Sequence, residues 1–211
     1  MPETDHTSSD TSESGTSERG HSRPKPGERR IQILQALAEM LEQPGGERIT
    51  TAGLAARLQV SEAALYRHFA SKAQMFEGLI DFIEQSVFAL VNQVETQAQS
   101  SGASCAANVV TLLMKFAEKN PGMTRVMVGD ALVLEHERLQ LRMNLFFDKL
   151  EAALKQFLRA DTSDSVAPTV DAQVRASVLI AFTRGRLQRY TRSGFKRLPS
   201  EQLEACLAQV L

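Results

Sequence analysis

A run of small and polar residues between positions 61 and 72 has side chains suited to contact with a nucleic acid. It offers hydroxyls, a carboxylate, an imidazole and two cationic groups, which bond phosphates or base edges, and two alanines that permit close approach. These residues are Ser61, Glu62, Ala63, Ala64, Tyr66, Arg67, His68 and Lys72. On one face of a helix, such a set suits the DNA major groove.

Individual side chains in this run favour different contacts. Ala63 and Ala64 leave room for apolar contact with thymine methyl groups, while Tyr66 and His68 can donate to backbone phosphates. Arg67 is the best candidate for hydrogen bonds to a guanine, and a phosphate contact is equally compatible with its chemistry. The run therefore predicts both base and phosphate contacts.

Two short crossing helices would place these side chains outward. Residues with inward spacing for such a crossing are Leu54, Ala55, Leu58, Val60, Leu65 and Phe69. Thr50 or Thr51 can cap the first helix and Ser61 the second, and hydroxyls at helix starts also bind phosphate. Lys72 begins the following helix, where it suits a flanking phosphate. We therefore predict a helix-turn-helix over 50–69.

A plain helical hairpin within a core is the alternative interpretation of the same segment. Its polar residues would then form a solvated face, because hydrophobic periodicity alone does not distinguish such a face from one that reads DNA. Gln59 lies in the turn, where many such motifs have Gly because the backbone there tends toward the left-handed region. Both interpretations place two helices here.

The rest of the chain has helical periodicity and no competing alternation of strands. Apolar stripes at helical spacing begin at Leu34, Met75, Ala106, Leu139, Val174 and Leu203, and Ser71 with Gln74 forms a capping-box pattern. Pro44 and Pro121, each followed by Gly, interrupt them. The polar stretch 100–104 is expected to be a loop. We predict an all-α fold of about nine helices.

Composition sets the domain organisation that we expect. Residues 1–28 are rich in Ser, Thr, Glu, Gly and Pro and predict a disordered tail, acidic at first and basic from Arg19 onward. Its basic end could touch phosphates, although a solvated tail is the simpler interpretation. Residues 29–72 form the expected DNA-binding domain, and 73–211 a helical domain for dimerisation and partner binding.

The formal net charge of -1 gives the chain no overall cationic field. Affinity for nucleic acid must therefore come from locally clustered Arg and Lys. Two distant cysteines, Cys105 and Cys206, give neither a disulfide framework nor a zinc pattern, so a reducing cytoplasm is the simplest location. No run of apolar residues predicts a signal peptide or a membrane span.

An enzyme is a poor interpretation of this sequence. The four histidines, His6, His21, His68 and His136, are scattered, and Glu135-His136-Glu137 lacks a second histidine at metal-binding spacing. A solvated helical surface explains that trio better. There is no glycine-rich phosphate loop or nucleophile elbow, so we predict no catalytic residue, metal site or cofactor.

The helix-turn-helix resembles the DNA-binding segment of TetR-type regulators. The matching runs are Ile49-Thr50-Thr51-Ala52, Leu54-Ala55, Val60 to Phe69 and Ser71-Lys72. Further runs resemble one branch of that family, the nucleoid occlusion factors: Met75-Phe76, Leu79-Ile80, Phe82-Ile83-Glu84, Glu118 to Arg125, Ala131-Leu132 and Arg192-Ser193 with Phe195-Lys196. The similarity runs from about Arg29 to Leu211 and leaves out the tail.

This resemblance implies a TetR-like homodimer that binds palindromic chromosomal sites in double-stranded DNA, with a dimer of dimers on DNA as one arrangement. While bound there, in the cytoplasm at the nucleoid, it would oppose assembly of the division GTPase FtsZ. In that branch the FtsZ tail lies between the fourth and fifth helices, at positions matching Phe82, Leu112, Lys119 and Asn120. Phe82 and Leu112 could receive an apolar residue, but their helical stripes would serve a core equally well.

Two further expectations concern the C-terminal helices. Phe182, Leu187, Tyr190 and Phe195 give this region more apolar surface than a peripheral helix needs, which suits a four-helix dimer interface, with burial inside one subunit as the alternative. A ligand-responsive TetR-type repressor is the rival function. It requires a closed apolar cavity in the C-terminal domain, whereas partner binding requires only an open groove.

Overall fold

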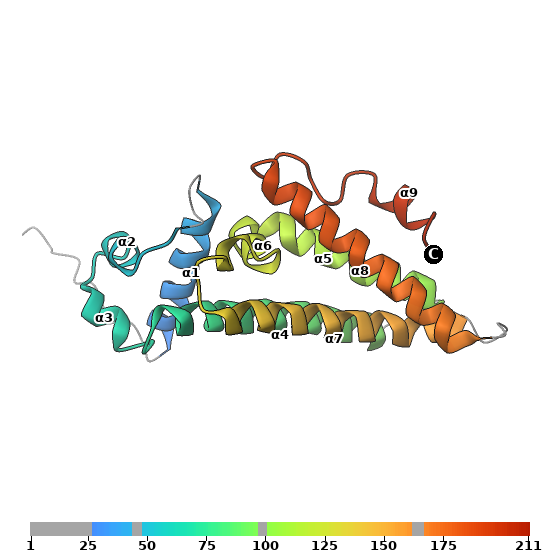
Figure 1. Ribbon diagram of the computed structural model, residues 1–211, viewed down its shortest axis with the longest axis horizontal. Coiled ribbons are helices and arrows are strands. Elements are labelled where there is room, and N and C mark those ends of the chain that lie inside the picture. Colours follow the sequence, from blue (N-terminus) through green and yellow to red (C-terminus); the bar gives the residue numbers. More distant parts are fainter. Residues whose placement is uncertain (1–26, 44–47, 97–100, 162–166) are drawn as a thin grey trace, which may run out of the picture.

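The computed structural model describes residues 27–43, 48–96, 101–161 and 167–211. Within these residues every regular element is helical, so the predicted all-α class is confirmed (Figure 1). The elements are α1 (Glu28–Glu42), α2 (Thr51–Arg57), α3 (Glu62–Tyr66), α4 (Lys72–Thr96), α5 (Gly102–Lys119), α6 (Pro121–Met127), a 3-10 turn η1 (Asp130–Leu132), α7 (Glu137–Asp161), α8 (Pro168–Arg192) and α9 (Leu203–Leu207). The predicted tail lies outside the described residues except for Gly27 and Glu28, and Glu28 already begins α1.

The molecule is elongated, with the small helices α1 to α3 at one end and the long helices extending away from them (Figure 1). We call α1 to α3 the head and the remaining helices the body. Helix α7 packs against α4, α5 and α8, so the main core lies among these four helices. Helix α4 begins beside α3 and continues through the body, and it therefore joins the two parts.

Head and body meet where α1 packs against α6. The contact is close because residue 122 is a glycine: a Cβ atom there would lie 1.9 Å from the carbonyl oxygen of Ala38 on α1. Helix α6 is buried from Gly122 to Met127 and begins with Pro121 at its first turn, where the missing N–H costs nothing. The head is thus fixed to the body by backbone contact as well as by α4.

The start of α5 differs from the predicted loop at 100–104, which is wrong from Gly102 onward. Ser101 caps the helix by accepting a hydrogen bond from the Ser104 amide at 3.2 Å. Asp161, at the end of α7, accepts from the amides of Gly102, at 2.8 Å, and Ala103. A tertiary contact with α7 therefore extends α5 by about one turn beyond its apolar stripe.

A ladder of ion pairs runs between α4 and α7. Arg138 pairs with Glu77 at 2.7 Å, Arg142 with Asp81 at 2.7 Å, and Lys149 with Glu84. Burial works against the charge of Arg142, but its hydrogen bonds with Asp81 and Glu84 and their charges raise its pKa above the ordinary value. The ladder aligns α4, the helix that leaves the head, with α7, a body helix of the same length.

No helix in the described ranges is long and apolar enough to cross a membrane. The two cysteines form no disulfide: Cys105 is buried and Cys206 is half-buried.

Candidate nucleic-acid interface

Helices α2 and α3 cross with the inward residues that the spacing predicts. Leu54, Ala55, Leu65 and Phe69 are at most 3% exposed, and Leu58 packs against them half-buried. Val60 is half-buried in the same way. The small side chain of Ala55 lets the two helices approach, and the polar residues of both remain outside.

The turn between the two helices contains a residue in the left-handed backbone conformation, as its position suggests. Gln59 has φ 55°, in the left-handed region, and the Val60 amide donates to the Ala55 carbonyl at 3.0 Å. This bond closes the turn and sets the angle at which α3 leaves α2. The expectation of left-handed backbone at this position is confirmed.

Threonine and serine hydroxyls hold the starts of both helices. Thr50 caps α2 by accepting from the Gly53 amide at 3.1 Å, and Ser61 caps α3 by accepting from the Ala64 amide at 3.2 Å. Thr51 donates to Glu62 at 2.6 Å and so ties α2 to α3. The hydroxyl protons of the two caps remain able to donate to a phosphate, whereas that of Thr51 is directed to the carboxylate.

The exposed face of α3 carries the small and polar residues that were singled out. Ala63 is exposed, Ala64 is half-buried and Tyr66 is 45% exposed. Helix α3 ends at Tyr66, so Arg67, which is exposed, and His68 lie in the turn after the helix. These two residues flank α3 instead of extending it. The second helix of the motif is therefore shorter than predicted, because the expected motif runs to Phe69.

Lys72 lies at the start of α4, as predicted, but its ammonium group already has a partner. It forms an ion pair with Glu135, whose side chain is 9% exposed, in the segment between η1 and α7. The solvated surface predicted for Glu135-His136-Glu137 therefore holds for His136 and Glu137, which are exposed, and is wrong for Glu135. The sequence has no pattern that links residues 72 and 135.

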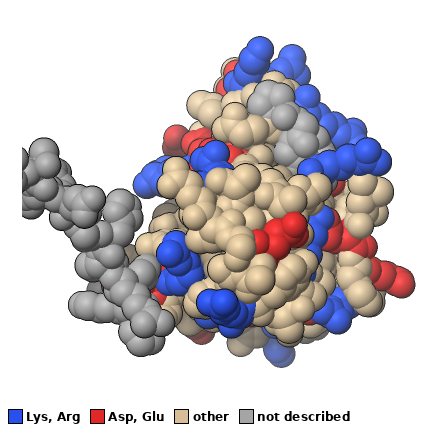
Figure 2. Space-filling view, turned by 90° about the vertical axis from the view of Figure 1, so that its left-hand side faces the viewer, with Lys and Arg blue, Asp and Glu red and all other residues tan. Residues whose placement is uncertain are grey.

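Arg30 is a residue of this region whose position the sequence did not indicate. Its guanidinium donates to the carbonyl of His68 and lies 4.1 Å from the ring centroid of Phe69. The first turn of α1 is thereby held against the segment that follows α3. The end of the molecule that contains the head carries many Lys and Arg side chains around its edge and fewer Asp and Glu (Figure 2).

A second group of predicted residues lies on α4 and α5, which pack against each other. Phe82 is 48% exposed, so the interpretation of Phe82 as a core residue is wrong. Leu112 is half-buried, and Lys119 is exposed near the end of α5. Asn120 ends that helix, and its side-chain amide donates to the Phe116 carbonyl at 2.7 Å. This α4–α5 surface therefore combines an unburied aromatic ring with a cation.

The apolar residues predicted for a dimer interface are mostly inside the protomer. Leu187 and Tyr190 are buried, so for these two residues the alternative, burial inside one subunit, holds, while Phe182 and Phe195 are half-buried. Burial raises the pKa of Tyr190, as do the nearby carboxylates of Glu118 and Glu42.

Different apolar side chains of the same two long helices are exposed. Val170, Val174 and Val178 follow one another at intervals of four along α8, and α7 exposes Leu141 and Leu145. We call these five residues the apolar face.

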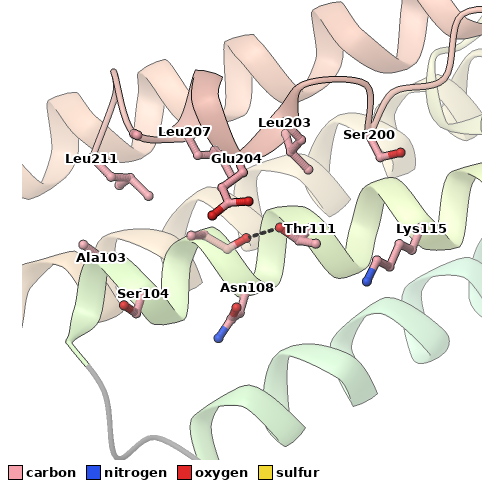
Figure 3. Close-up of a pocket in the computed structure, with 12 residues that line it drawn as sticks. Ala103, Ser104, Asn108, Thr111, Lys115, Ser200, Leu203, Glu204, Leu207 and Leu211 are labelled. Carbon is pink, nitrogen blue, oxygen red and sulfur yellow. Dashed lines mark hydrogen bonds between the residues drawn. The ribbon is translucent and has the colours of Figure 1, made fainter.

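Two hollows lined by residues of the described part of the chain are open. One of about 790 Å³ lies between α5 and the C-terminal segment with α9 (Figure 3). Leu203, Glu204 and Leu207 face α5 across it. Another, of about 760 Å³, lies near Arg48 and Arg192 at the junction with the head. Both open to solvent, unlike the enclosed cavity that a ligand-responsive repressor would need. In the described part of the chain, no three His, Cys, Asp or Glu side chains gather as metal ligands.

Comparison with known families matches both parts of the chain. Residues 33–79 match the family described as "Bacterial regulatory proteins, tetR family". Residues 104–210 match the SlmA-like family described as "Tetracyclin repressor-like, C-terminal domain". Head and body are thus each recognised separately.

Curated relatives share nearly half of their residues with this chain. The nucleoid occlusion factor SlmA of Idiomarina loihiensis is 49% identical over 178 residues, which are 84% of this chain and 90% of the relative. The nucleoid occlusion factor SlmA of Marinomonas sp. is 50% identical, again over 84% of this chain and 90% of the relative. This similarity spans most of both proteins.

Solved structures share the fold at lower identity. The TetR-family regulator PfmR of Thermus thermophilus has a TM-score of 0.69 at 19% identity and covers 85% of this chain and 97% of its own. FadR of Bacillus subtilis, solved with stearoyl-CoA, has a TM-score of 0.68 at 14% identity. The match covers 85% of this chain and 96% of FadR. At such identities the likeness concerns the fold alone.

Proposed function

Because this chain belongs to the SlmA family of nucleoid occlusion factors within the TetR-type regulators, we propose that it inhibits cell division from chromosomal DNA. Identity of 49% over 84% of the chain is the observation that carries this proposal. The family consists of DNA-binding regulators and not of enzymes. In the cell, the protein would act in the cytoplasm, at the nucleoid, where it would bind DNA and FtsZ together and disrupt FtsZ assembly.

The proposed DNA contacts lie on α3 and its flanks. Ala63 and Ala64 approach the base edges, Arg67 contacts a guanine or a phosphate, and Tyr66 and His68 donate to phosphates. Thr50, Thr51, Ser61, Glu62 and Lys72 complete the proposed set. The exposure of Ala63, Tyr66 and Arg67 and the free hydroxyl protons of the two caps support these roles.

The FtsZ tail would bind the α4–α5 surface. An apolar side chain of the tail would pack on the exposed ring of Phe82 beside Leu112, and acidic groups would meet Lys119. Asn120 would offer its remaining hydrogen-bonding capacity at the end of α5. The support is that Phe82 is 48% exposed, since an aromatic ring with that exposure has no role in this protomer's core.

We expect the active form to be a homodimer. Palindromic DNA presents two half-sites about one helical turn, roughly 34 Å, apart, and a two-fold dimer presents two heads to them. The apolar face on α7 and α8 supports such a pairing, because its five large apolar side chains are 47–60% exposed in the protomer. Two or more dimers along one DNA would raise the local concentration of weak FtsZ contacts.

A sedimentation experiment tests the division role. FtsZ polymer formed with GTP is pelleted in the presence of the protein and a chromosomal DNA fragment that it binds. We expect less FtsZ in the pellet with wild type and an unchanged pellet with Phe82→Asp. Leu198→Asp is the matched control, because Leu198 is 47% exposed and lies outside the α4–α5 surface.

Both variants should retain DNA binding. Unchanged polymer with saturating wild type would overturn the division role while leaving DNA binding intact. Equal loss of activity in Phe82→Asp and Leu198→Asp would instead remove the assignment of the tail to this surface.

A ligand-responsive TetR-type transcriptional repressor is the alternative function, and the shared fold with a regulator solved with stearoyl-CoA favours it. Genome-wide mapping of bound sites separates the two. Many sites scattered over the chromosome and absent near the replication terminus are expected for nucleoid occlusion. One or two promoters would support the local repressor.

A further inference from the structure

The first 18 residues of the chain have a charge opposite to that expected of a DNA-binding protein. They contain five carboxylates and neither Lys nor Arg: Glu3, Asp5, Asp10, Glu13 and Glu18. The whole chain has a formal net charge of -1, so all the other residues together carry +4. Residues 1–18, which we call the acidic segment, therefore mask the cationic character of the rest of the protein.

The point where this segment joins the structure lies beside the proposed DNA-reading face. Helix α1 starts at Glu28, and two residues later Arg30 donates to the His68 carbonyl and stacks on Phe69 at 4.1 Å. Eight residues lie between Glu18 and Gly27, and the nine residue steps from one to the other can span up to about 30 Å. Helix α3 itself is only about 8 Å long. Carboxylates of the acidic segment can therefore reach its exposed face.

The charges at that face complement those of the acidic segment. Between residues 29 and 72 there are six Arg and Lys and four Glu. Arg57 is paired with Glu39 at 2.5 Å, and Lys72 with Glu135, whereas Arg30 and Arg67 are exposed on the flanks of α3. Glu62 is bonded to the Thr51 hydroxyl at 2.6 Å. Carboxylates near Arg67 would occupy the positions that phosphates need.

On the premise of the proposed DNA binding, we propose that the acidic segment is a tethered competitor of DNA for the exposed face of α3 and its flanks. Tethering supplies an effective concentration in the millimolar range, so individually weak carboxylate contacts suffice. A competitor that covers the phosphate contacts weakens binding to every duplex by the same factor. The segment therefore sets the strength of DNA binding and leaves its sequence preference unchanged.

Neutralising the carboxylates in the full-length protein tests this inference. The variant combines Glu3→Gln, Asp5→Asn, Asp10→Asn, Glu13→Gln and Glu18→Gln, and fluorescence anisotropy measures its binding to a random-sequence duplex. We expect its affinity to rise about 3- to 10-fold at about 50 mM salt and the difference to fall below about 2-fold at about 300 mM salt. Deletion of residues 1–18 should have the same effect.

The matched control keeps the length and the charge of the segment. It combines Thr4→Ala, Ser9→Ala, Thr11→Ala, Ser14→Ala and Ser17→Ala, and its affinity should equal that of wild type. Amide NMR spectra locate the contact: neutralisation should shift the signals of Ala63, Ala64 and Arg67 but not those of Leu203 and Leu207 on α9. Equal affinities of wild type, neutralised and deleted proteins would overturn the inference and leave DNA binding standing. A failure of all of them to bind DNA would overturn both.

Discussion

Gln59 adopts a backbone conformation that an L-residue enters only at a cost. Its φ of 55° lies in the left-handed region, where the Cβ atom crowds the following carbonyl and glycine has no such conflict. We expect Gln59→Gly to raise the free energy of unfolding by about 0.5–1 kcal/mol, measured by urea denaturation. Gln85→Gly, at an exposed position within α4, should lower it by about 1 kcal/mol. A loss in both variants would contradict the strain at Gln59.

Lys72 is the residue whose DNA contact is most open to measurement. If it binds a phosphate, Lys72→Ala should weaken binding to all sequences and reduce the salt slope by about 1. Its ion pair with Glu135 competes with that contact, so Glu135→Gln should strengthen binding to any duplex. Glu137→Gln, at an exposed neighbour, is the control and should leave the affinity unchanged. A loss in Lys72→Ala that depends on the DNA sequence would indicate a base contact instead.

At the scale of elements, Gly122 decides how α1 and α6 fit together. An added methyl group would lie 1.9 Å from the Ala38 carbonyl oxygen, and backbone cannot yield as a flexible side chain does. We expect Gly122→Ala to lower the free energy of unfolding by about 1–3 kcal/mol, as overpacking generally does, measured by thermal denaturation. Gln85→Ala is the control: it places an alanine at an exposed helical position of α4, so stability should not fall. Equal stability of the Gly122→Ala variant would show that α6 is free to shift.

Periodicity predicted the long helices well because each has one apolar stripe. The predicted helix through Met75 and Val87 matches α4, Lys72–Thr96, and its predicted end at Gln97 lies outside the described residues. Half of the predicted capping box forms: Ser71 accepts from the Gln74 amide at 3.2 Å, while the Gln74 side chain accepts from the Ala70 amide. Helix α6 has no stripe because it is buried on all sides from Gly122 to Met127, so periodicity had no signal there.

Site residues were predictable where local spacing decides exposure. Ala55 and Leu65 point inward and Ala63 outward because α2 and α3 fix their direction within a few residues. Contacts between distant segments were not predictable, as with Lys72 and Glu135, which are 63 positions apart. For Tyr190 the sequence predicts either an interface or the interior of one subunit, because an apolar stripe does not reveal which partner covers it. The structure buries Tyr190 inside the protomer.

For the whole molecule, the head must be presented twice to read a palindrome, and the apolar face is the surface suited to that pairing. Val170, Val174 and Val178 repeat every four residues, and the exposed small residues Ala181 and Gly185 continue the same row, which allows close approach of a second helix. The buried polar residues of α8 cannot provide this contact. We therefore expect the pairing surface to run along the outer side of α8 and to include α7, which packs against α8 and exposes Leu141 and Leu145.

Val174→Asp tests this arrangement. A carboxylate in the middle of the face would be desolvated twice in a two-fold interface, so we expect a monomer in sedimentation velocity where wild type is a dimer. Binding to a palindromic site should fall more than about 10-fold, because the second head no longer binds with the advantage of linkage, while binding to a single half-site stays unchanged. Leu198→Asp, with similar exposure outside the face, should remain dimeric. If the Val174→Asp variant stays dimeric and binds the palindrome normally, the interface lies elsewhere. If it loses half-site binding, the substitution disturbs the head and not the pairing.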